Sequence, residues 1–127
     1  AIAASPDGPK FHIGPGQKNL LLYITAAGGA DPKGAFVWAA TADARTAADP
    51  QKVQKAYVRD LLARVAEARR DKPTLIVFDC TRVPVSWAHG MLFNDFARAL
   101  KELDAEVAKN PNLVVICSSD EDQRSWV

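Results

Sequence analysis

The fold is indicated first by the run Thr74-Leu75-Ile76-Val77-Phe78-Asp79-Cys80. It is a short, unbroken apolar run that ends in an acid and a thiol. Similar runs stand before and after it, at Leu20-Leu21-Leu22-Tyr23-Ile24 and Leu113-Val114-Val115-Ile116-Cys117. Apolar runs without alternation are typical of strands that are buried on both faces, as in parallel sheets. We therefore expect strands over 18–26, 74–79 and 113–117 that lie side by side and parallel.

Helical patterns fill the two gaps between these runs. Asp49-Pro50 is typical of a helix start, and apolar residues follow at helical spacing until Pro73, which predicts a helix over 50–70. A second helix is predicted over 90–108, ended by Asn110-Pro111. Its expected buried face consists of Leu92, Phe96, Leu100, Leu103 and Val107. Alternation of strands and helices predicts an α/β fold, a three-layer sandwich with a mostly parallel sheet.

The domain organisation is simple. A chain of 127 residues is enough for one domain. Residues 1–17 are rich in proline and glycine and are predicted to be an irregular lead-in or linker, with the α/β domain over 18–127. The run 35–39 is expected to be an antiparallel return strand or an extended loop. Both ends of the sequence suggest a piece of a longer protein.

Composition excludes several classes of function. Hydrophobic residues make up 48% and charged residues 24%, and the net charge is +1. Such a charge gives no strong field toward nucleic acid. No apolar run approaches the length of a membrane span, and no signal peptide opens the chain. Two cysteines are too few for a disulfide framework, which favours a reducing, cytoplasmic location.

Ligands of open parallel sheets bind outside the carboxyl ends of the strands. Here that rule selects Gly28, the segment from Asp79 through Cys80, Thr81 and Arg82, and the pair Ser118 and Ser119. The sequence has no phosphate loop, no dinucleotide fingerprint and no cluster with metal-ligand spacing. We therefore expect no cofactor and no metal, and a binding site formed by these strand ends.

Cys80 is the candidate nucleophile, because it directly follows a buried strand. A nucleophilic thiol needs a base, and the sequence offers only His12, in the lead-in, and His89, nine residues after Cys80. The alternative is that Cys80 is a small buried side chain, as most unpaired cysteines are. Residue types alone leave both alternatives open.

Asp79 suggests a signalling alternative. A carboxylate at a strand end is a common phosphoacceptor, so a receiver-like or STAS-like domain centred on Asp79 or Ser86 is a further hypothesis. A receiver would need additional acids around Asp79 and a lysine after a later strand, and Asp120 and Glu121 follow Ser119 instead. Asp79 could equally brace the loop through backbone N–H groups.

At these strand ends the sequence resembles the caspase-like proteases, a clan that includes caspases, metacaspases and bacterial caspase-like domains. Family members carry a strand that ends in Ser-x-His-Gly, which corresponds to Thr25-Ala26-Ala27-Gly28 here. The catalytic cysteine follows a second strand about 50 residues later. Here the resemblance places it at Cys80 or, two residues after Asp79, at Thr81. Ala27 and Cys80 are 53 positions apart. The strand ending at Cys117-Ser118-Ser119 and the later Ser125-Trp126 extend the resemblance over residues 18–127 as a partial domain.

This resemblance implies a decayed active site. The position of the family histidine is Ala27, which has no proton-accepting side chain. Without an imidazole, no general base deprotonates the thiol and no general acid protonates the leaving amine. The implied function is a degenerate caspase-like domain of a larger bacterial protein that binds a protein or peptide partner. The alternative is an active cysteine endopeptidase that uses Cys80 with His89 or a histidine elsewhere.

Overall fold

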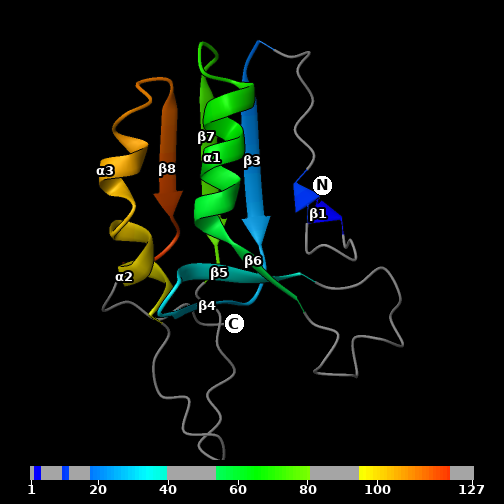
Figure 1. The fold of residues 1–127 in the computed structure, drawn as a ribbon, viewed down its shortest axis with the longest axis vertical. Coiled ribbons are helices and arrows are strands. Elements are labelled where there is room, and N and C mark those ends of the chain that lie inside the picture. Colours follow the sequence, from blue (N-terminus) through cyan, green and yellow to red (C-terminus); the bar gives the residue numbers. More distant parts are fainter. Residues whose placement is uncertain (1, 4–9, 12–17, 40–53, 81–94, 121–127) are drawn as a thin grey trace, which may run out of the picture.

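The computed structural model describes residues 2–3, 10–11, 18–39, 54–80 and 95–120. Its centre is a parallel sheet in the order β3-β7-β8, formed by Leu20–Thr25, Thr74–Asp79 and Leu113–Cys117 (Figure 1). The register pairs Leu20 with Thr74 and Thr74 with Leu113. The prediction of three adjacent parallel strands is therefore confirmed, and the chain is α/β.

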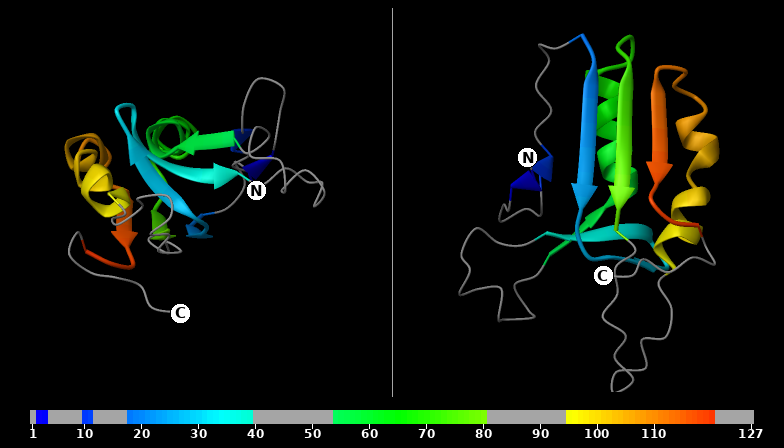
Figure 2. Two further views of the ribbon diagram at one scale, coloured as in Figure 1. Left: turned by 90° about the horizontal axis from the view of Figure 1, so that it is seen from below. Right: turned by 180° about the vertical axis from the view of Figure 1, so that it is seen from behind.

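All described helices lie on one face of this sheet, which we call the covered face (Figures 1 and 2). They are α1 (Val58–Ala68), α2 (Phe96–Lys101) and α3 (Asp104–Val107). Side chains from β7 that point to this face, such as Ile76 and Phe78, are fully buried. Phe78 meets Phe96 of α2 with ring centroids 5.7 Å apart. The main hydrophobic core lies between the parallel sheet and these helices.

The opposite face, which we call the open face, is apolar and exposed. Its large side chains have exposed fractions of 67% for Leu21, 58% for Tyr23, 53% for Val114 and 46% for Ile116. Leu75 and Val77 of β7 lie between them and are partly buried. The prediction that these strands are buried on both faces is therefore wrong for β3 and β8. The described residues form two layers, because their helices all lie on the covered face.

A second, antiparallel sheet lies across the carboxyl ends of the parallel strands (Figure 1). It contains β4 (Gly28–Asp31), β5 (Gly34–Ala39) and β6 (Gln54–Tyr57). The turn between β4 and β5 needs Gly34, whose φ of 114° is unfavourable for other residues. The expectation of an antiparallel strand over 35–39 is confirmed by the pairing of β4 with β5.

The first helix is shorter than predicted. Residues 54–57 form β6 and pair with β5, and α1 begins at Val58, not at Pro50. Tertiary pairing overrides the local helical pattern here, because Phe36 pairs with Tyr57 across the two strands. The predicted end before Pro73 agrees with a helix that ends at Ala68. Residues 50–53 lie outside the described ranges.

The second predicted helix is divided. Within 95–120 it forms α2 and α3, with Glu102 and Leu103 between them, and its predicted start at 90–94 lies outside the described residues. Phe96, Leu100 and Leu103 are buried as expected. In the predicted lead-in, β1 (Ile2–Ala3) and β2 (Lys10–Phe11) form a short antiparallel pair. No helix among the described residues has the length and apolar character to cross a membrane.

Candidate functional site

Polar side chains from all three parallel strands meet at their carboxyl ends. Asp79, which is largely buried, accepts hydrogen bonds from the Tyr23 hydroxyl at 3.1 Å and from the Ser118 hydroxyl at 2.9 Å. Thr25 is the register partner of Asp79 on β3. Alternation along each strand puts Thr25, Asp79 and Ser118 on the open face, beyond its apolar residues. The predicted proximity of Asp79 and Ser118 is therefore confirmed.

Cys80 points the other way. Its side chain is fully buried in the core under the covered face, and its thiol donates to the carbonyl of Ile24 at 3.5 Å. Burial raises the pKa of the Cys80 thiol to about 12. Smaller contributions from Cys117 and Asp79 act in the same direction, and a backbone hydrogen bond at Ala26 opposes them. A thiol in this environment is protonated at neutral pH and is a poor nucleophile.

The chain passes very close to Cys80 at Gly28. The Gly28 amide donates to the Cys80 carbonyl at 3.0 Å. A Cβ at position 28 would lie 2.6 Å from that carbonyl oxygen and 2.8 Å from Cδ2 of Phe96. Gly28 thus has a structural reason to be glycine, because any side chain would separate β4 from β7. The predicted binding role of Gly28 has no support in this contact.

Ala27, which the resemblance to caspase-like proteases aligns with a histidine, lies between β3 and β4 and is exposed. Its carbonyl accepts a hydrogen bond from the Trp38 amide at 2.9 Å. Both histidines of the sequence, His12 and His89, lie outside the described residues, as do Thr81, Arg82 and Ser86. Neither a Cys80–His89 dyad nor a loop site at Thr81 and Arg82 is tested by the described geometry.

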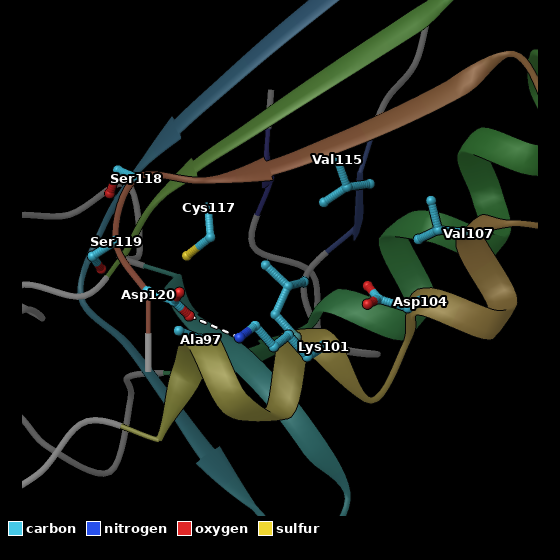
Figure 3. A pocket seen from close by; sticks show the side chains of 10 residues that line it. Ala97, Lys101, Asp104, Val107, Val115, Cys117, Ser118, Ser119 and Asp120 are labelled. Carbon is cyan, nitrogen blue, oxygen red and sulfur yellow. Dashed lines mark hydrogen bonds and ion pairs between the residues drawn. The ribbon is translucent and has the colours of Figure 1, made fainter. Parts of the chain in front are cut away.

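A pocket of about 440 Å³ lies on the covered side, between β8 and the helices α2 and α3 (Figure 3). Lys101 and Asp120 form an ion pair at 2.7 Å there. Cys117, Ser118 and Ser119 contribute to its wall. The remaining lining residues are Ala97, Leu100, Asp104, Val107 and Val115. Ser118 lines this pocket and also donates to Asp79, so the pocket adjoins the polar side chains at the strand ends. Ser119 lies on the pocket side of Ser118.

The predicted strand-end residues thus lie in three places. Thr25, Asp79 and Ser118 form a polar row on the open face, together with Tyr23. Cys80 lies in the core, and a pocket lies on the covered side. Tyr23 is a member of the row that the sequence did not indicate as functional. Its signal was the alternation within β3, because Tyr23 lies on the same side as Thr25. Lys101 was also missed, since its pairing with Asp120 depends on how α2 packs against β8.

The described ranges contain no group of three or more histidine, cysteine or acidic side chains placed to hold a metal ion. Asp79 accepts hydrogen bonds from the hydroxyl groups of Tyr23 and Ser118. A receiver site needs clustered carboxylates around the phosphoacceptor, so the signalling hypothesis gains no support from this geometry.

Comparison with known proteins gives no relative. A scan against protein-family models, a search of the curated proteins and a search of the solved structures each found no match. Arguments about function therefore depend on the residues and their geometry.

Proposed function

We propose that this chain is a catalytically degenerate domain of the caspase-like type and acts as a binding module for a protein partner. The buried Cys80 thiol is the observation that carries this proposal. The resemblance places the family nucleophile at Cys80 or one position later at Thr81. Cys80 lies in the hydrophobic core with its hydrogen bond directed to Ile24.

Two other features support a loss of catalysis. Ala27 stands where the resemblance places the histidine base, and its methyl group cannot accept a proton. The close approach of Gly28 to Cys80 also leaves no room for a substrate carbonyl between β4 and β7. Cys80 is fully buried in the core, so a peptide would have to displace core side chains to reach its sulfur atom.

The binding role is supported by the open face. Large apolar side chains are exposed together on β3 and β8, and parallel sheets are normally covered on both faces. The three-layer sandwich expected for a caspase-like domain would need a further layer on this face. A contiguous apolar surface of this kind is typical of an interaction site.

Thiol alkylation tests the proposal. The two variants, Cys117→Ala and Cys80→Ala, each leave one cysteine for labelling with iodoacetamide across a range of pH. A pKa of about 12 instead of the ordinary value of 9.0 lowers the thiolate fraction at neutral pH by about 1000-fold. We expect slow labelling of Cys80, and faster labelling of Cys117 at the same pH.

The opposite result is equally clear. Rapid modification of Cys80 at pH 6, with the protein still folded by circular dichroism, would contradict the proposal and favour the active peptidase. Cleavage of a mixed peptide library that disappears in Cys80→Ala would do the same.

A further inference from the structure

We propose that the open face binds a second copy of this chain, sheet to sheet, about a two-fold axis that runs across the strands. The proposal rests on the binding role proposed above and names its partner. Its starting point is the exposure of Leu21, Tyr23, Val114 and Ile116 on one surface.

The open face has a definite order along the strands. Asn19 and Asn112 occupy the positions directly before β3 and β8, at the amino end. Two apolar rows follow, Leu21–Leu75–Val114 and Tyr23–Val77–Ile116, as the register defines them. Thr25, Asp79 and Ser118 complete the face at the carboxyl end. Amides thus border the apolar rows at one end, and a carboxylate with hydroxyls borders them at the other.

A two-fold axis across the strands makes this order complementary to itself. It reverses the strand direction of the second copy, so the apolar rows of one sheet lie over those of the other. Asn19 at the amino end then faces the Asp79 end of the partner, while the Asn112 side-chain amide donates within its own chain to the Arg70 carbonyl. The result is an apolar core with a polar rim at both ends, which is the usual anatomy of a protein interface.

Charge selects the same arrangement. The segments at the amino end carry Lys18, Arg70 and Lys72 against a single acid, Asp71. At the carboxyl end, the open face carries the Asp79 carboxylate, whereas Asp120 lines the covered-side pocket and is paired with Lys101. Reversed strands bring the basic end of one copy toward the Asp79 end of the other. A two-fold axis along the strands would place like ends together and lose this attraction.

Sheet geometry allows the contact. Two apolar sheet faces pack about 10 Å apart with their side chains interdigitated. Tyr23 is suited to the centre of such an interface, because its ring is exposed while its hydroxyl is held by Asp79. Aromatic side chains fixed in this way lose little conformational freedom on binding. In the dimer each sheet supplies the cover that the other lacks.

Analytical ultracentrifugation of the full chain tests the proposal. We expect a species of twice the chain mass of 13.7 kDa, formed between about 1 and about 200 µM, the range of moderate dimers. Ile116→Lys should weaken this dimer by about tenfold or more, because it buries a charge at the interface centre. Val114→Lys provides a second disruptive variant if the first fails to fold. Ala63→Lys, at an exposed position of α1, is the matched control and should leave the dimer unchanged.

The outcomes separate this proposal from the binding role itself. A chain that remains monomeric at the highest concentration would overturn the dimer. So would a dimer that survives both Ile116→Lys and Val114→Lys in folded protein, since it must then use another surface. Binding of a different protein by a monomeric chain would also overturn it while leaving the binding role intact. Thiol alkylation measures the reactivity of Cys80 and not the oligomeric state, so it tests the loss of catalysis independently of the dimer.

Discussion

The two faces of the parallel sheet are built from the same kinds of residue and differ in what covers them. Ile76 on β7 is fully buried beneath the helices, whereas Ile116 on β8 is nearly half exposed on the open face. The strands provide apolar side chains in both directions, but the described helices cover one direction only. An apolar strand pattern therefore indicates that both faces of the sheet need cover, but it does not specify which element covers each face.

The largest expected effect comes from making the same substitution on the two faces. Ile76→Ala removes buried methylene and methyl groups and leaves a cavity, so it should destabilise the chain by about 2–5 kcal/mol. Ile116→Ala should cost less than about 1 kcal/mol, because its side chain already contacts solvent. Urea unfolding at low-micromolar concentration measures both. Equal losses in the free energy of unfolding would contradict the difference between the two faces and show that the open face is covered in the monomer.

Gly28→Ala tests how closely β4 approaches the end of β7 at Cys80. The new methyl group would meet the backbone oxygen of Cys80 at 2.6 Å, and backbone cannot move as a side-chain tip can. We expect a loss of about 1–3 kcal/mol in the free energy of unfolding, as for other overpacked cores. Ala27→Ser at the exposed neighbouring position is the control and should change stability little. A neutral Gly28→Ala would show that β4 and β7 are further apart than described.

Alkaline pH should destabilise the covered side through Cys80. Its pKa is about 12 in the folded chain, against an ordinary value of 9.0. The unfolded thiol ionises first, so stability is complete below about pH 9 and falls as the pH rises toward 12, by up to about 1.4 kcal/mol per unit. The comparison of the native chain with Cys80→Ala by urea unfolding isolates this contribution. An identical alkaline slope in both would contradict the buried position of the thiol.

The smallest expected effect lies in the polar row of the open face. Tyr23→Phe removes one hydrogen bond to Asp79 and keeps the ring, so it should cost about 1 kcal/mol. Ser118→Ala removes the other donor and should have a similar effect. Because both hydroxyls share one carboxylate, the double variant should depart from additivity, which a double-mutant cycle measures. Strict additivity would indicate that the two bonds do not belong to one network.

Much of the fold could be predicted from local patterns. The three apolar runs predicted β7 and β8 to the residue and β3 to within two residues, because strands of a parallel sheet are marked by short runs between turn signals. Their adjacency followed from the helical segments between them. The boundary of α1 could not be predicted, since residues 54–57 are helical in pattern and become β6 through pairing with β5.

The candidate site shows the same division. Cys80, Asp79 and Ser118 were each identified as strand-end residues, but their directions depend on the pleat of each strand and on the helices beyond it. Neighbours in sequence, Asp79 and Cys80 point to opposite faces, so one joins a surface network and the other enters the core. The absence of a histidine at position 27 was visible in the sequence, whereas the burial of the Cys80 thiol was not.

The sequence alone determined which segments are strands, that they run parallel, and that no histidine stands at position 27. Those properties follow from residue type and from periodicity along the chain. Tertiary structure decided which face of the sheet the helices cover and how closely Gly28 approaches Cys80. It also decided the position of the Arg69 side chain, which is buried at the end of α1 and donates to Thr74 and to the Lys18 carbonyl. The bond from Arg69 to Thr74 spans five residues, but the other contacts join residues far apart in the sequence. The physical reason is that long-range packing selects among local conformations of similar free energy.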